Sequence, residues 1–164
     1  MIDLGFVSPD KAEPQAEWRS PLARALRDAP RHVVDLSGWG KLELRGEIDR
    51  VDFPYRAEVV RITPRRALVL TRNPRTASLR AKLRAQGLFV TDLTGALAGI
   101  QLRDETVLRR LTDLDLGALP AVGAVAHVQA TVLRDGEHFR IFFPQEYSDY
   151  LAEVVLDALE GVRG

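Results

Sequence analysis

The sequence has 164 residues, of which 46% are hydrophobic and 28% are charged, a balance typical of a globular protein. This length suits one domain, or two small halves packed around a shared core. The absence of cysteine excludes a disulfide scaffold, a cysteine nucleophile and thiolate-bound iron–sulfur or zinc sites. No apolar run approaches the roughly 18 residues that span a membrane, and no signal peptide is visible, so we expect a cytoplasmic protein without membrane contact.

The formal net charge is zero, but the charges are unevenly distributed. Within residues 56–84, eight arginines and one lysine stand against a single acid, Glu58. A basic stretch of this kind is one mark of nucleic-acid binding, yet no aromatic residue is interleaved here to stack on bases. We therefore interpret the stretch as a solvated basic surface and expect no nucleic-acid partner.

The amino-terminal part of the chain predicts an irregular arm that leads into a short helix. Ser20 is a good helix cap, and Pro21 suits the first helical position, where its missing N–H donor is not needed. Leu22 and Leu26 would lie on one apolar face, and Pro30 would end the helix.

A short motif then occurs twice in the chain. Residues 33–38 read Val-Val-Asp-Leu-Ser-Gly, and residues 90–95 read Val-Thr-Asp-Leu-Thr-Gly. Each copy precedes a run of alternating apolar residues, which is typical of a half-buried strand. Later in each copy, an apolar strand leads into a helix. The pattern predicts an internal duplication into two ferredoxin-like halves, each with helices on one face of an antiparallel sheet.

The predicted fold is therefore α+β, with an arm and short helix at 1–30 and a domain at 31–164 that is built from pseudo-repeats at about 31–87 and 88–164. Alternation predicts strands at about 41–45, 57–62, 67–71, 98–102, 125–133 and 137–143. Apolar spacing of three and four residues predicts helices at about 76–86, 105–112 and 145–160.

One hairpin is predicted in detail from the dipeptide Asp135-Gly136, because both residues tolerate positive φ in a two-residue turn. The expected pairs are Arg134–Glu137, Val132–Phe139, Ala130–Ile141 and Val128–Phe143, which place apolar residues on one face. In this register Thr131 faces Arg140, and Gln129 faces Phe142. The more polar face is either a solvated surface or a ligand or partner site, whose candidate residues are His127, Gln129, Thr131, Arg140 and Phe142.

No catalytic motif is recognisable in the sequence. The three histidines, at positions 32, 127 and 138, have neither metal-ligand spacing nor a nearby cluster of carboxylates, so we expect no metal site. Asp35 and Asp92 each precede a hydroxyl residue and a glycine, a pattern that favours a role in turns over catalysis. We accordingly predict no catalytic residues.

Several segments resemble one protein family in the same order along the chain. Residues 84–94, Arg-Ala-Gln-Gly-Leu-Phe-Val-Thr-Asp-Leu-Thr, resemble the Gly-Leu-Phe-Asp-Val-Ser-His-Met segment of glycine-cleavage T-protein, an aminomethyltransferase. Residues 20–23, 60–69 and 142–151 are similar to passages of the gamma subunit of heterotetrameric sarcosine oxidase. The resemblance implies the folate-binding fold of the aminomethyltransferase superfamily over residues 20 to 160.

The chain departs from that family at its functional positions. Where T-proteins carry a catalytic aspartate, residues 127–130 read His-Val-Gln-Ala, and the folate-contacting His-Met corresponds to Gly95-Ala96. The resemblance thus implies a non-catalytic structural or assembly subunit of a sarcosine oxidase-type oxidoreductase. Its partners would be flavoprotein alpha and beta subunits, which in that family hold NAD, folate, FAD and FMN.

The alternative is a stand-alone protein that binds tetrahydrofolate or another small molecule on the His127–Arg140 face. On this reading, the Arg140 guanidinium would hold a carboxylate through two parallel hydrogen bonds, and Phe142 would supply an aromatic wall. Chemistry on the same face, by an enzyme of unknown class, also stays open.

Overall fold

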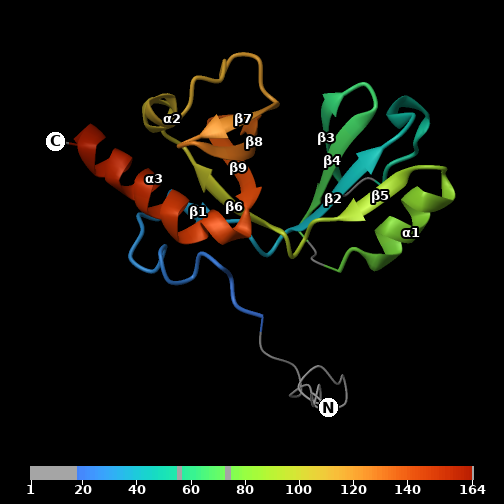
Figure 1. The fold of residues 1–164 in the computed structure, drawn as a ribbon, viewed down its shortest axis with the longest axis horizontal. Coiled ribbons are helices and arrows are strands. Elements are labelled where there is room, and N and C mark those ends of the chain that lie inside the picture. The colour runs from blue at the N-terminus through green and yellow to red at the C-terminus, as the bar shows by residue number, and fades with distance from the viewer. Residues whose placement is uncertain (1–17, 55–56, 73–74, 164) are drawn as a thin grey trace, which may run out of the picture.

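A computed structural model describes residues 18–54, 57–72 and 75–163. Two antiparallel sheets form lobes that lie side by side, with α1 on one lobe and α2 and α3 on the other (Figure 1). This is the predicted α+β class, with two antiparallel sheets and helices on one face of each.

The first lobe has a four-stranded sheet in the order β3-β4-β2-β5, formed by β2 (Gly40–Arg45), β3 (Glu58–Thr63), β4 (Arg66–Thr71) and β5 (Phe89–Asp92). A 3-10 turn, η3 (Ile48–Arg50), follows β2. Helix α1 (Ala77–Ala85) covers one face, where Leu83 packs with apolar residues from β2, β4 and β5. Gly87 follows the helix with a φ of 83°, the left-handed conformation that ends helices.

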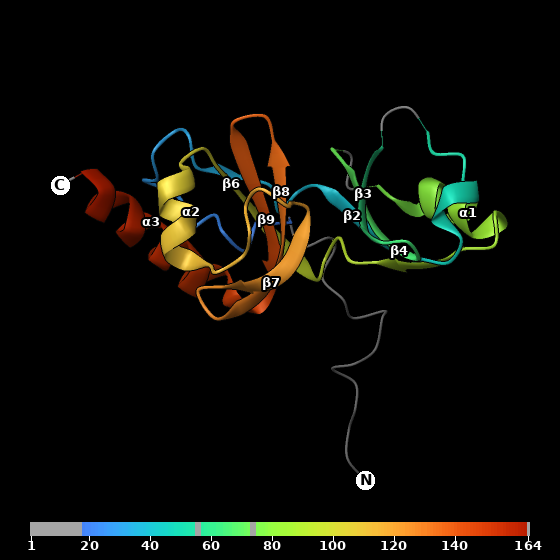
Figure 2. The ribbon, with the colours of Figure 1, turned by 90° about the horizontal axis from the view of Figure 1, so that it is seen from above.

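The second lobe has a five-stranded sheet in the order β1-β6-β9-β8-β7. Its strands are β1 (Val34–Asp35), β6 (Leu97–Leu102), β7 (Ala121–Val125), β8 (Val128–Asp135) and β9 (His138–Pro144). The helices α2 (Glu105–Leu111) and α3 (Ser148–Arg163) lie together on one face of this sheet (Figure 2). The main core lies between that face and the helices, and includes Ile100, Val132, Ile141, Leu108 and Val155.

The repeated motif exchanges a strand between the lobes. Strand β1 from the first copy pairs with β6, while β5 from the second copy pairs with β2. The predicted repeat boundary near residue 88 is therefore followed at once by a strand that belongs to the first sheet. The backbone N–H of Leu36 donates to the Gly99 carbonyl at 2.7 Å, and that of Leu93 donates to the Lys41 carbonyl at 2.8 Å.

The two aspartates of the motif make equivalent hydrogen bonds. Oδ1 of Asp35 accepts from the Ser37 backbone N–H at 2.8 Å, and Oδ1 of Asp92 accepts from the Thr94 backbone N–H at 3.0 Å. The other oxygen of each carboxylate accepts a hydroxyl hydrogen bond, from Ser20 and from Thr76 respectively. Both aspartates therefore have the predicted role in turns, and the repetition is structural as well as sequential.

The prediction of a short helix between Ser20 and Pro30 is wrong, because this segment is a series of turns. Ser20 does accept the Leu22 backbone N–H at 3.1 Å, as a cap would. However, its hydroxyl donates to Asp35, and most of the backbone hydrogen bonds in the segment span three residues rather than four. Leu22 is nonetheless fully buried in the core of the second lobe.

The predicted strand at 125–133 is also corrected, because it is two strands, β7 and β8, joined by a turn at Ala126 and His127. The last helix starts with a 3-10 turn, η4 (Gln145–Tyr147), in which the Gln145 carbonyl accepts the Ser148 backbone N–H and, at 2.6 Å, the Ser148 hydroxyl. It then continues as α3 to Arg163, so the predicted end at about residue 160 is three residues short.

The hairpin register differs from the prediction by two residues. Asp135 pairs with His138 and Leu133 pairs with Arg140, so Gly136 and Glu137 form the turn. Only Gly136 needs a positive φ here, 58°, whereas the predicted turn required one at Asp135 as well. Because the shift is an even number, every side chain stays on its predicted face, but Thr131 pairs with Phe142 rather than with Arg140.

Candidate functional site

The face of β8 and β9 predicted to be polar is largely a contact between the lobes. Leu133 and Phe142 on this face are 3% and 1% exposed. They pack in one cluster with Leu36, which follows β1, and with three apolar residues of the first lobe, Val60, Leu68 and Leu70. The five candidate residues are therefore distributed over three environments: an ion pair between the lobes, a groove beside it and a separate cavity.

Arg140, whose side chain is buried, forms the ion pair between the lobes. Its side chain donates to Glu58 on β3 and to Asp135 on β8, and its guanidinium lies 5.3 Å from the ring centre of Trp39. Burial alone would lower the pKa of Arg140, but the hydrogen bonds to both carboxylates raise it above its ordinary value. The Arg140 guanidinium, predicted to bind a ligand carboxylate, is thus already paired with two carboxylates of the protein. The buried Nε of Arg140 has no hydrogen-bond partner.

Gln129, Thr131 and Phe142 come together as predicted, in a groove between the lobes of about 160 Å³. The first lobe contributes Ile62 and an ion-pair cluster in which Arg45 and Arg66 both donate to Glu43 Oε1, each at 2.9 Å. Apolar walls from Leu93 and Leu97 complete it. The groove thus combines an apolar floor with a charged rim.

The groove does not fit a folate-sized group. Pockets for ligands of that size are typically about 300–1,000 Å³, and a cavity of about 150 Å³ holds a single benzene ring. Arg140, the expected partner of a ligand carboxylate, lies outside this groove in its own ion pairs. The groove is therefore of a size to admit one side chain.

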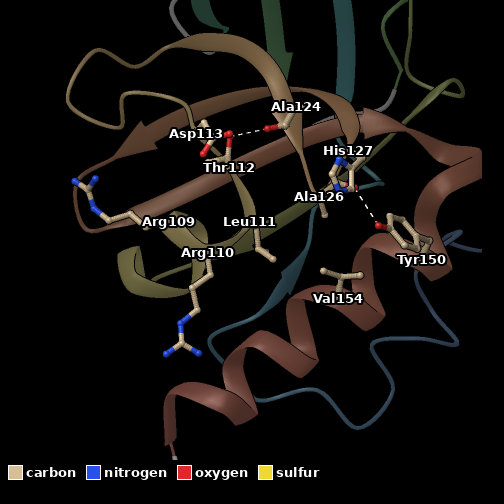
Figure 3. Close-up of a pocket in the computed structure, with 10 residues that line it drawn as sticks. All are labelled: Arg109, Arg110, Leu111, Thr112, Asp113, Ala124, Ala126, His127, Tyr150 and Val154. Atoms are coloured by element: carbon tan, nitrogen blue, oxygen red, sulfur yellow. Dashed lines mark hydrogen bonds between the residues drawn. The ribbon is translucent and has the colours of Figure 1, made fainter.

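His127 lies in another cavity, of about 350 Å³, between the end of α2, the β7–β8 turn and α3 (Figure 3). His127 and Tyr150 lie near each other there, while the guanidinium groups of Arg109 and Arg110 point away. Arg109 pairs with Glu105, and Arg110 donates to the Gly161 carbonyl at 3.1 Å. The polar groups of this cavity therefore do not converge on one point.

The turn beside this cavity is strained. Ala126 and His127 have φ values of 46° and 65°, although neither is the glycine or asparagine that such a turn favours. The Ala126 N–H donates to the Leu111 carbonyl at 2.6 Å, and the Tyr150 hydroxyl donates to the Ala126 carbonyl at 3.1 Å. Contacts from α2 and α3 thus hold the turn in place.

Lys41 is a fully buried cation near the crossing of the lobes, and no pattern in the sequence points to it. Its Nζ donates to the carbonyls of Ser37 and Trp39, each at 2.8 Å. Burial lowers the pKa of Lys41 to about 8, and the charges of Asp35 and Asp92 oppose that shift. Asp92 is affected differently. Burial alone would raise the pKa of this carboxyl, but hydrogen bonds from Thr76 and Thr94 and the nearby Arg80 hold it below its ordinary value.

Sequence reasoning also missed the cluster of Glu43, Arg45 and Arg66. The alternation at 41–45 shows that Glu43 and Arg45 share a face of a strand. It does not show that Arg66 on β4 lies opposite Arg45, a pairing that depends on the register between two strands over twenty residues apart. Within the described ranges, no three His, Cys, Asp or Glu residues are grouped to hold a metal. No helix among the described residues is long and apolar enough to cross a membrane.

Comparison with solved structures reveals the fold. A chain of heterotetrameric sarcosine oxidase from Corynebacterium sp. U-96, in complex with pyrrole 2-carboxylate, matches with a TM-score of 0.73. The match covers 90% of this chain and 97% of that chain at 15% identity. The two chains share a fold.

A chain in a structure of aspartokinase alpha and beta subunits is also similar, with a TM-score of 0.51 and 9% identity over 80% of this chain and 99% of that chain. No family model matches the sequence, and no curated protein matches it. The resemblance to sarcosine oxidase seen in short motifs is therefore supported at the level of the fold.

Proposed function

We propose that this chain is a non-catalytic structural or assembly subunit of an oxidoreductase, resembling the gamma subunit of heterotetrameric sarcosine oxidase. The observation that supports the proposal most is the similarity over almost the whole of both chains to a chain from a four-subunit enzyme. A chain that matches one subunit from end to end is expected to act as a subunit itself. Its partners would be flavoprotein alpha- and beta-type subunits.

The arrangement of polar side chains favours assembly over catalysis. Arg140 is committed to Glu58 and Asp135, and Glu43 is committed to Arg45 and Arg66. The Arg140–Glu58 pair joins the two lobes, whereas the Glu43 cluster lies within the first lobe. Groups paired in this way are not available to exchange protons with a substrate.

The test is purification of an affinity-tagged chain from its own cells, followed by native mass measurement and an absorption spectrum. The proposal predicts co-purification in fixed stoichiometry with larger flavin-containing chains, and sarcosine turnover only in that complex. A chain that purifies alone, or that turns over sarcosine or an aminomethyl donor alone, would contradict the proposal.

A second candidate is a small-molecule-binding function, favoured by the cavity of about 350 Å³ beside His127, which lies in the size range of ligand pockets. Calorimetry with tetrahydrofolate would compare the wild type with His127→Ala. His138→Ala, on β9, serves as the matched control. Binding that only His127→Ala weakens would support this candidate, and heat changes that neither variant alters would remove it.

A further inference from the structure

The first sheet leaves part of one face uncovered. Its inner positions, which include Val60, Leu68 and Leu70, contact the second lobe. On the same face, β2 pairs Arg45 with Phe89 and Glu43 with Thr91. The Phe89 side chain is 69% exposed, although phenylalanine is among the residues most often buried.

The uncovered face continues into the groove lined by Gln129, Thr131 and Phe142, because Glu43 and Arg66 belong to both. An exposed aromatic residue, two arginines and a groove of about 160 Å³ therefore lie on one surface. Aromatic and arginine side chains dominate the binding energy of protein interfaces, most of all around a pocket that excludes water.

Charge indicates what the surface would accept. Arg45 and Arg66 share the single carboxylate of Glu43, so this cluster has one positive charge in excess. The surplus extends beyond the cluster, since residues 39–92 contain twelve lysines and arginines against six acids. An acidic partner group would be attracted here, and the planar guanidinium of either arginine suits a carboxylate.

We infer that this surface, defined by Arg45, Arg66, Phe89 and the adjoining groove, docks a partner-protein segment that carries an aromatic side chain next to a carboxylate. The ring enters the groove, and the carboxylate pairs with Arg45 and Arg66. The volume of the groove favours a side chain over a cofactor as its occupant, because the groove holds about one aromatic ring. The inference rests on the proposed function, and it adds the location and the chemistry of the contact.

The test uses the full chain labelled for NMR and three capped tetrapeptides, Gly-Phe-Asp-Gly, Gly-Phe-Lys-Gly and Gly-Ala-Asp-Gly. We expect the first to bind with a dissociation constant of roughly 1 mM and to shift the amide signals of Phe89, Leu97 and Thr131. The other two should bind at least about tenfold more weakly, since each lacks one of the two groups.

Variants with exposed side chains separate binding from folding. Arg45→Glu should weaken the first peptide about tenfold, whereas Arg103→Glu should not. Both arginines pair with a glutamate and are similarly exposed, at 64% and 60%, but Arg103 lies in the second lobe. Equal binding of the three peptides, shifts elsewhere, no binding, or indifference to Arg45→Glu would each overturn the inference. If a flavoprotein complex still forms in cells and survives Arg45→Glu, the inference fails while the proposed function stands.

Discussion

The two lobes share the hydrogen bonds of the repeated aspartate motif and differ in the side chains around that motif. Asp35 and Asp92 each close a turn and accept a hydroxyl, and each motif places a strand in the opposite sheet. Yet where the first lobe has buried Lys41, the corresponding position of the second lobe is Gly99. The comparison indicates that the strand exchange depends on the backbone and the aspartates, while the neighbouring side chains are free to diverge.

The lobes also differ in charge. Residues 39–92 carry six positive charges in excess, and residues 93–164 carry five negative charges in excess. Among the described residues, the first lobe has one α-helix and a sheet face that is partly uncovered, whereas the second has two α-helices over its core. The second lobe thus has the larger apolar core, and the first has the more basic surface.

The largest expected effect concerns Lys41, a buried cation where the second lobe has Gly99. Its pKa is about 8 in the folded protein against 10.5 ordinarily, so between these values the unfolded chain binds more protons. Raising the pH through this window therefore stabilises the folded state, by about 3 kcal/mol when the shift is converted at 1.36 kcal/mol per unit.

Urea unfolding of the wild type and Lys41→Met at several pH values would measure this. Relative to the variant, the wild type should gain unfolding free energy from pH 8 to 10.5. Parallel pH dependences of the two proteins would show that Lys41 does not carry the shifted pKa.

The second prediction concerns Gly99, the counterpart of Lys41. A Cβ at this position would lie 2.8 Å from the Phe142 ring and 3.1 Å from Leu36 Cβ. Gly99→Ala should therefore lower the unfolding free energy by about 2 kcal/mol, the middle of the range for overpacking. Gly95→Ala is the matched control, since nothing lies within 4 Å of its added Cβ. Thermal or urea unfolding of both variants provides the comparison, and equal stabilities would mean that the site relaxes easily.

The third prediction concerns Arg140, which joins the two lobes. Its side chain is 6% exposed, but those of Glu58 and Asp135 are 44% and 59% exposed, so solvent screens the pairs. Arg140→Ala should cost about 1.5 kcal/mol, mainly through lost packing against Trp39 and between the lobes. Arg140→Met should cost less, because it keeps the apolar stem. A larger loss for methionine than for alanine would contradict this division between packing and charge.

The smallest expected effect compares the two aspartates. Asp35→Ala and Asp92→Ala each remove a hydroxyl and a backbone hydrogen bond to a carboxylate, so each should destabilise by about 1 kcal/mol. The pKa of Asp92 is lowered in the folded state, so its contribution is present above the ordinary pKa of 3.8 and is lost as the pH falls below it. Unfolding of Asp92→Asn should accordingly depend less on pH in acid than unfolding of the wild type.

Much of the fold was predictable because its signals are local. Alternation located the strands, and the spacing of apolar residues located the helices. Leu83, Val107 and Leu108 are buried as expected, and Leu79 is half-buried. The helix predicted after Ser20 does not form, because the Ser20 hydroxyl makes a tertiary hydrogen bond to Asp35 that competes with helix formation. Local patterns do not contain that competitor.

The candidate site was less predictable, because it depends on how the sheets meet. The sequence pattern placed Gln129, Thr131, Arg140 and Phe142 correctly on one face of the hairpin. It did not show that the other lobe covers this face and pairs Arg140 with Glu58. The turn at Ala126 and His127 carries no glycine or asparagine, so it gave no sequence signal to divide the predicted strand.

The most direct test of the account is native-state hydrogen exchange at two amides, those of Leu36 and Leu93, which donate across the exchanged strands. If the exchanged strands unite the lobes, both amides exchange hydrogen only through global unfolding. Their opening free energies should then agree within about 0.5 kcal/mol with each other and with the free energy of unfolding measured in urea. An opening free energy lower by more than about 1 kcal/mol at one of them would show that its strand detaches alone, and would contradict a single cooperative unit.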